Sequence, residues 1–194
     1  MLLNAAMDAP NVYSVVSDDF TSMYDATLEM IRSGVKDILY FYNSTSYSGK
    51  KKLAGYRAAM EEKGLLTNGS FLQLYQGSHE DIPAMAEQLI RLHTKGITFH
   101  GVIAADDSLA LGAMKYGREM RLRIPEDLSI ISFNNSLFAR LTSPQLTSID
   151  INSGQLGSEA ASQIINHIEN PNLLATKIIV PHRLIERDSC CNIC

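Results

Sequence analysis

Two short apolar segments of the sequence are each followed by carboxylate or amide side chains. Asp106 and Asp107 follow the run at 101–105, and the Asn-Asn-Ser segment at 134–136 follows the run at 128–133. Continuous apolar runs of this length are typical of buried parallel strands, and ligands of open α/β sheets bind outside the carboxyl ends of such strands. Carboxylates accept hydrogen bonds, whereas amides and hydroxyls both donate and accept them. The pattern therefore predicts a small-molecule site at two neighbouring strand ends.

A third polar segment, residues 43–52, ends in three consecutive lysines just where a helix is expected to begin. Its place between a strand and a helix is that of a phosphate-binding loop. However, Ser44 replaces the required first glycine, and Lys51 stands where a serine or threonine should follow the lysine. A helix amino terminus beside lysines can still hold an anion. The residues alone favour a solvated first helical turn over a ligand site.

Catalytic and metal-binding patterns are missing from the sequence. It has neither a G-x-S-x-G nor an H-E-x-x-H motif, and its histidines show no ligand spacing with other donors. All the cysteines lie in the last five residues, at Cys190, Cys191 and Cys194, where they favour a loose, solvated tail over a thiol or zinc site. We therefore expect no catalytic residue, no metal and no cofactor.

The composition is that of an ordinary globular protein. The chain has 194 residues, of which 45% are hydrophobic and 20% charged, and a net charge of −4. Its apolar runs are far shorter than the roughly 20 residues needed to cross a bilayer, and its start lacks the pattern of a secretory signal, so we expect no membrane contact and a cytoplasmic location. The single basic run, at 50–52, is too short for a nucleic-acid surface, and we expect no direct grip on DNA.

The polar segments require a set of alternating strands and helices to position them. The helical spacing of apolar residues, together with the turn residues, predicts helices that begin near Phe20, Lys50, Ile82, Ser108 and Ser153. Strands are expected over 12–17, 37–42, 71–75, 101–105, 128–133 and 177–186. Such alternation predicts an α/β fold with a doubly wound parallel sheet.

Several segments resemble one protein family in order and spacing. They are V-I-A-A-D-D-S-L-A-L-G-A, I-P-E-D-L-S-I-I-S-F-N-N-S and S-P-Q-L-T-S-I, together with V-V-S-D-D, I-R-S-G-V-K-D-I-L, K-L-A-G-Y and L-I-E-R-D-S. This pattern is similar to the LacI/GalR family of bacterial transcriptional regulators, and the resemblance covers nearly the whole chain. It implies a type I periplasmic-binding-protein-like fold that binds a small-molecule effector, dimerises and controls operator binding allosterically.

The resemblance also implies a domain organisation. Residues 1–18 and the helix-bearing segment 150–176 would belong to an amino-terminal effector-binding subdomain. Residues 19–149 and a closing strand over 177–188 would form the carboxyl-terminal one, and 189–194 would be a tail. The headpiece that contacts operator DNA, and about half of the amino-terminal subdomain, would lie outside this sequence. We expect the helix near 153–170 to be poorly supported, since it lacks a complete sheet to pack on.

Four positions are implied as effector contacts. Lys52 stands where the family usually has an arginine, and Ser48 where a serine or threonine often contacts the effector. Asp106 replaces a frequent asparagine, and Asn134 a frequent aspartate. Lysine lacks the planar fork of arginine, so bidentate recognition is weakened. The expected effector is a sugar or a phosphorylated sugar.

Four further residues are weaker candidates. Asp107 is an alternative contact, although it is also expected to cap the following helix. An aromatic side chain that stacks on the effector would be expected near 79–80, where His79 and Glu80 are found. Tyr47 or Phe133 could take its place.

The resemblance implies a homodimer. The helix that begins at Ser108 would supply Leu109 and Ala113 to the dimer interface, and the loop at 137–141 would supply Phe138 and Leu141. Two other functions remain open from the sequence: a sugar-binding protein of a transport system, and an effector-binding module that acts without DNA.

Overall fold

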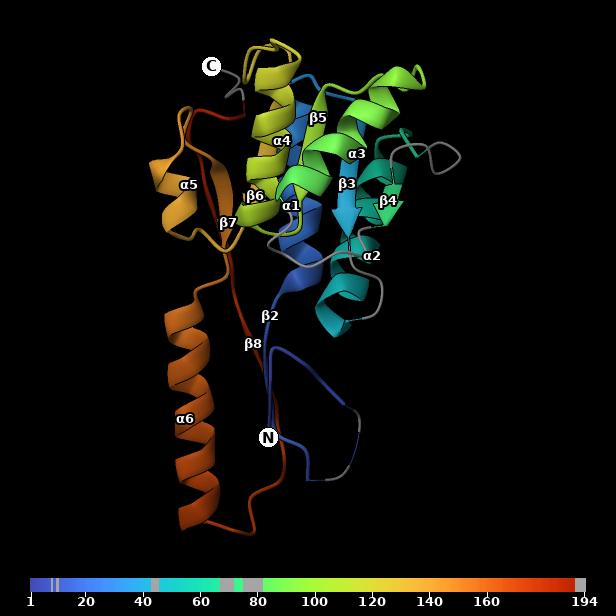
Figure 1. The fold of residues 1–194 in the computed structure, drawn as a ribbon. Helices are drawn as coiled ribbons and strands as arrows, with labels where there is room; N and C mark the ends of the chain where they lie inside the picture. Colours follow the sequence, from blue (N-terminus) through green and yellow to red (C-terminus); the bar gives the residue numbers. More distant parts are fainter. Residues whose placement is uncertain (8, 10, 43–45, 67–71, 75–81, 191–194) are drawn as a thin grey trace.

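The computed structural model describes residues 1–7, 9, 11–42, 46–66, 72–74 and 82–190 of the chain. It contains two sheets that lie one above the other in Figure 1. The strands of the larger sheet, in spatial order, are β4 (Leu72–Leu74), β3 (Ile38–Tyr42), β5 (Gly101–Ala104), β6 (Ser129–Phe133), β7 (Thr147–Asp150) and β9 (Arg183–Ile185). Those of the smaller sheet are β1 (Leu2–Leu3), β2 (Ser14–Ser17) and β8 (Lys177–Val180).

Helices cover both faces of the larger sheet. One face carries α1 (Asp19–Arg32) and α2 (Tyr47–Glu62), and the other carries α3 (Ile82–Thr94) and α4 (Asp107–Glu119). Alternation along β3 serves both layers, because Ile38 and Tyr40 point to the first face while Leu39 and Phe41 point to the second. This six-stranded sheet with helices α1 to α5, the large body, confirms the predicted doubly wound α/β fold.

The smaller sheet has one helix, α6 (Ser153–Glu169), packed on it. Its buried core consists of Val15, Leu156, Ala160 and Val180. We call this sheet with α6 the small body. Apolar side chains such as Ile168 stay exposed on its surface, because three strands cannot cover the whole apolar stripe of a five-turn helix.

Close backbone packing and local caps hold the helices in place. Asp18 caps α1 by accepting a hydrogen bond from the backbone nitrogen of Thr21 at 3.2 Å. Helices α1 and α2 cross at Gly55, where a Cβ atom would collide with the carbonyl oxygen of Phe20. This contact packs the middle of α2, one turn after the lysine segment, against α1.

The chain passes between the two bodies three times. The crossings are the short links from β2 to α1, from β7 to α6 and from β8 to β9. The last link corrects the sequence analysis, which expected one strand over 177–186 within the parallel sheet. Pro181 cannot donate to a ladder, and the strand is divided there: β8 pairs with β2 in the small body, and β9 runs antiparallel to β7 in the large body.

Two further elements differ from the expectation. Strand β7 was not predicted, because Thr147 and Ser148 interrupt its apolar pattern; both are buried and hydrogen-bonded. Residues 137–141, expected as a loop, form the short helix α5 (Leu137–Leu141).

The prediction of a loose tail over 189–194 is wrong for Ser189 and Cys190. Ser189 is buried, and its hydroxyl accepts from the backbone nitrogen of Thr147 at 2.8 Å and donates to the carbonyl oxygen of Ile130 at 2.7 Å. Cys190 is buried in the core formed with α1 and α2. These bonds bind the segment to β6 and β7. Cys191 and Cys194 lie outside the described residues.

Candidate functional site

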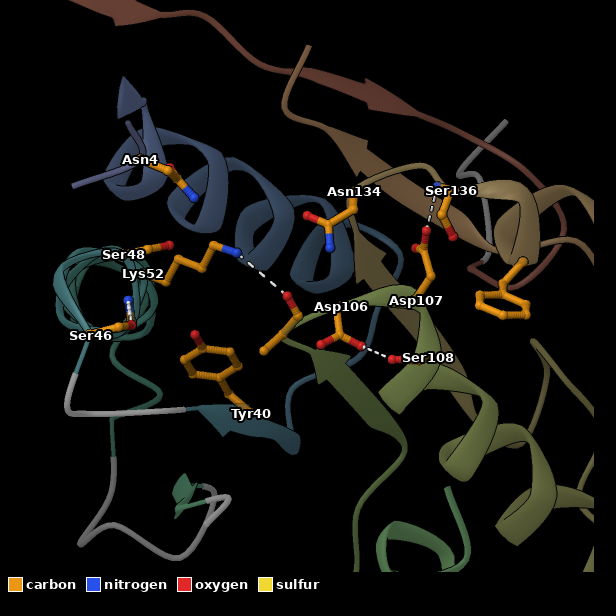
Figure 2. Close-up of a pocket in the computed structure, with 13 residues that line it drawn as sticks. Asn4, Tyr40, Ser46, Ser48, Lys52, Asp106, Asp107, Ser108, Asn134 and Ser136 are labelled. Carbon is orange, nitrogen blue, oxygen red and sulfur yellow. Dashed lines mark hydrogen bonds between the residues drawn. The ribbon is translucent and has the colours of Figure 1, made fainter. Parts of the chain in front are cut away.

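A cavity of about 570 Å³ lies at the carboxyl ends of the strands of the large body. Its volume is within the range of small-molecule sites. The large body contributes Ser48 and Lys52 from α2, Asp106 from the end of β5, and Asn134 from the end of β6. These are the four residues that the sequence resemblance implied as contacts, and the structure brings them to one pocket (Figure 2). The small body contributes Asn4.

Lys52 is buried at this pocket, with 8% of its surface exposed, whereas Lys50 and Lys51 are exposed. Its ammonium lies 3.4 Å from the carbonyl oxygen of Ala105 and 4.1 Å from the centre of the Phe133 ring. Burial lowers the pKa of Lys52, while the charges of Asp19 and Asp106 oppose that change. The solvated first turn that the residues alone favoured is therefore wrong for this lysine.

Asp106 caps helix α4. Its Oδ1 accepts hydrogen bonds from the backbone nitrogen of Leu109 at 2.9 Å and from the hydroxyl of Ser108 at 2.6 Å. The expectation that Asp107 would cap this helix is wrong. As the cap, Asp106 holds a fixed carboxylate at the pocket wall, beside the positive end of the helix dipole.

Asp107 is buried behind the pocket and is bound by the protein itself. Its Oδ1 accepts from the hydroxyls of Ser132 at 2.5 Å and Ser148 at 2.7 Å, and its Oδ2 accepts from the backbone nitrogen of Ser136 at 2.6 Å. It thereby joins the ends of β5, β6 and β7. We assign it to the positioning of the pocket wall, since its oxygens already have partners.

Asn134 occupies a backbone conformation that few residues adopt. Its φ is +93°, and its backbone nitrogen donates to the carbonyl oxygen of Ile149 at 2.8 Å. Asparagine tolerates positive φ better than most side chains, and the turn leaves its amide exposed at the pocket. Asn135 is directed elsewhere, since its amide oxygen accepts from Arg187 at 2.6 Å.

Three buried polar atoms among the described residues have no hydrogen-bond partner: Asp19 Oδ2, the Tyr40 hydroxyl and Ser136 Oγ. Tyr40 and Ser136 line the pocket. Buried polar groups nearly always have partners, so these atoms mark places where a ligand can supply one. Ser136 belongs to the polar segment 134–136 that was predicted for the site, whereas Tyr40 and Asp19 were missed, because Tyr40 reads as part of an apolar strand and Asp19 as part of a helix start.

The aromatic residues suggested for stacking are not placed for it. Phe133 is fully buried, and Lys52 covers one face of its ring. Tyr47 is absent from the described pocket lining; its hydroxyl accepts from Lys177 of the small body at 2.8 Å. His79 lies outside the described residues.

The expected dimer residues divide into two groups. The prediction that Leu109 and Ala113 contact a partner is wrong, because both side chains are fully buried where α4 packs on the sheet. Phe138 and Leu141 of α5 are 52% and 71% exposed. Beside them, an apolar groove is formed by α4 and the following loops, including Leu111, Met114, Leu122, Ile124 and Pro144. The partly exposed residues of α4, Leu111 and Met114, therefore lie on a different face of the helix from the predicted Leu109 and Ala113.

The described residues contain no group of three or more histidine, cysteine or acidic side chains arranged to hold a metal ion. No helix in the described part of the chain is long and apolar enough to cross a membrane. The polar groups of the described pocket lining are hydrogen-bond donors and acceptors, with one lysine among them.

Comparisons with known proteins agree with this geometry. Residues 27–190 match the periplasmic binding protein-like domain family. The chain is 35% identical to an HTH-type transcriptional regulator of Lachnoclostridium phytofermentans, over 96% of this chain and 55% of the relative. The curated relatives that the chain matches are thus about twice its length.

Solved structures show the same fold. A transcriptional regulator LacI from Bacillus cereus superposes with a TM-score of 0.87 at 27% identity, over 97% of this chain and 67% of that chain. A sugar-binding regulator of the LacI family from Escherichia coli, solved with phosphate, superposes with a TM-score of 0.83 at 26% identity, over 97% and 66%.

Proposed function

Since the chain belongs to the periplasmic binding protein-like family and matches the effector-binding region of LacI/GalR-type transcriptional regulators, we propose that it binds a sugar-like effector and thereby controls operator binding by a separate DNA-binding headpiece. A cytoplasmic location and the absence of catalysis are parts of this proposal, because such a regulator acts on chromosomal DNA and releases its effector unchanged.

The observation that carries the proposal is the set of hydrogen-bonding groups at one pocket. Lys52 donates through a charged group, Asp106 accepts, and Ser48 and Asn134 both donate and accept. A sugar offers several hydroxyls that need such partners at close spacing. The ligand class is therefore a sugar, either neutral or phosphorylated.

The pocket lies where the two bodies meet, and this position supplies a mechanism. Asn4 belongs to the small body, whereas Lys52, Asp106 and Asn134 belong to the large body. A ligand that contacts both bodies stabilises the relative orientation that brings both sets of groups to it. In a dimer, that orientation would set the spacing of two headpieces and hence their affinity for a palindromic operator.

The proposed homodimer would use the outward face of α4 and α5. An apolar surface there is partly exposed and consists of Leu111, Met114, Phe138 and Leu141. Leu111 and Met114 also line the groove that includes Pro144. Surfaces of this kind commonly mark sites of association. Replacing Leu141 with a charged residue should shift the full-length protein toward monomer in light scattering, whereas a strict monomer before substitution would contradict the dimer.

Calorimetry on the full-length protein tests the effector site. For whichever sugar binds the wild type, we expect Lys52→Ala to weaken binding about tenfold to a hundredfold, because a charged donor is lost from a buried site. Lys52→Arg should retain part of the affinity. Lys50→Ala is the matched control, since Lys50 is exposed on the same turn, and it should change nothing. Unchanged affinity in Lys52→Ala would remove this lysine from the site.

A further inference from the structure

The floor of the pocket contains a tyrosine hydroxyl without a partner. Tyr40 is fully buried between the rings of Tyr42 and Tyr56, with ring centres 5.6 and 5.4 Å away. Its hydroxyl has no hydrogen-bond partner among the residues that the structure describes, and Figure 2 shows it directed into the space that the labelled pocket side chains surround. The neighbouring Tyr56 differs, since its hydroxyl donates to the carbonyl oxygen of Ile38 at 2.8 Å.

Asp19 adds a negative charge that acts on Tyr40 and Lys52. It is buried at the start of α1, where its Oδ1 accepts from the hydroxyl of Ser17 at 2.9 Å while its Oδ2 has no partner. Its negative charge raises the pKa of both Tyr40 and Lys52, although burial is the larger influence on each. The charge of Asp19 thus offsets part of the charge of Lys52, although Asp19 is not among the described residues that line the pocket.

The charges around the pocket are unfavourable for an anion. Lys52 is the one cation among the described residues that line it, and the carboxylates of Asp19 and Asp106 both act on this cation. A phosphate group would find the ammonium already balanced and would meet the carboxylate of Asp106 at the pocket wall. A neutral hydroxyl, by contrast, can accept from Lys52 and can either donate to the Tyr40 hydroxyl or accept from it.

We propose that the Tyr40 hydroxyl forms, with Lys52, a hydroxyl-binding subsite that makes the pocket select a neutral polyhydroxylated ligand over the corresponding phosphate ester. This inference rests on the proposed sugar-binding function and adds to it the charge class of the ligand and one contact residue, Tyr40. It also accounts for the unpartnered hydroxyl, because a buried polar group without a partner destabilises the fold and gains one only when ligand is bound.

The first test needs no ligand. Tyr40→Phe and Tyr56→Phe remove the same atom from two stacked, buried rings, and urea unfolding is measured for both. We expect the midpoint for Tyr40→Phe to equal or exceed that of the wild type, because no bond is lost, and the midpoint for Tyr56→Phe to fall. An equal fall in both variants would show that the Tyr40 hydroxyl is bonded within the protein and would overturn the proposal.

The second test measures ligand affinity by calorimetry on the full-length protein. The probes are ribose, cellobiose and glucose, with ribose 5-phosphate, glucose 6-phosphate and inorganic phosphate as their anionic counterparts. We expect a neutral sugar to bind at least tenfold more tightly than its phosphate ester. Tyr40→Phe should weaken binding of that sugar about five- to tenfold.

Matched controls separate the subsite from general damage. Tyr56→Phe should leave the affinity unchanged, because Tyr56 is not among the described residues of the pocket lining and its hydroxyl is bonded within the protein. Equal affinity in wild type and Tyr40→Phe, or preference for the phosphate ester, would overturn the subsite while leaving sugar binding intact. Failure of every probe to bind wild type would instead count against the proposed function, and the unfolding test would still decide whether the hydroxyl is free.

Discussion

The two bodies of the molecule bury their apolar residues to very different extents. The large body has a core on each face of its sheet, with side chains such as Leu39, Tyr56 and Leu89 fully buried. The small body has a core of four residues, and beside it Ile164, Ile165 and Ile168 of α6 are exposed. Nearly all described pocket residues belong to the large body.

The difference shows which part of the molecule can hold a ligand site rigidly. A side chain in a densely packed body keeps its rotamer, so Lys52 and Asp106 stay in position whether or not ligand is bound. The small body has little packing of its own and contributes Asn4. The large body therefore supplies most of the ligand contacts, and the small body is the part whose structure can adjust to the ligand.

Asp107→Ala tests the rigidity of the large body and should have the largest effect. Two buried serine hydroxyls and one backbone N–H lose their acceptor, so we expect the free energy of unfolding to fall by about 3–5 kcal/mol in urea titration. Glu87→Ala, at an exposed ion pair on α3, should stay within about 0.5 kcal/mol. Similar values for both would contradict the role assigned to Asp107.

Leu156→Ala probes the small body in the same way, with a smaller expected effect. Removing a buried leucine side chain from this thin core should cost about 2–3 kcal/mol. Hydrogen exchange should accelerate at the amides of β2 and β8 and remain slow in β5 and β6. If the amides of β5 and β6 lose protection by the same factor, the two bodies unfold as one unit and the contrast between them fails.

The pH dependence of stability should depend on Lys52. Because burial lowers its folded-state pKa below 10.5, the unfolded chain holds more protons between that lowered pKa and 10.5. The free energy of unfolding should therefore rise with pH across this window and be independent of this group below it. Lys52→Met, followed by urea titration at several pH values, should remove the rise; parallel curves for wild type and variant would contradict it.

Ile168→Gln should change stability least. This side chain is 72% exposed on α6, so we expect the free energy of unfolding to stay within about 0.5 kcal/mol. Light scattering at high concentration should show less self-association than the wild type, because exposed apolar area is removed. A loss of more than 1 kcal/mol would mean that α6 has packing partners in solution that the small body does not supply.

The sequence predicted the sheet and its functional edge well, because both follow from local pattern. The apolar runs at β5 and β6 end in Asp106 and Asn134, and parallel strands place such ends together. The helical period alone could have predicted that Lys52 is buried while Lys50 and Lys51 are exposed. It lies four residues before the buried Tyr56, on the same face of α2.

Other features depend on contacts that pattern does not contain. Strand β7 is stabilised by hydrogen bonds of buried threonine and serine, so its residues do not look apolar. Ser189 and Cys190 are buried by contacts with β6 and α1, which lie far from them in the sequence. Likewise, the free hydroxyl of Tyr40 is visible only when every neighbouring acceptor is known.

The three short links between the bodies limit how the molecule can move. A single flexible link would let one body turn about any axis and twist freely on the other. Three links, at 17–19, 150–153 and 180–183, resist twisting and sliding together, because each permitted displacement must satisfy all of them at once. The molecule should behave as a hinge with essentially one degree of freedom, along which ligands of different shape differ only in how far they close it.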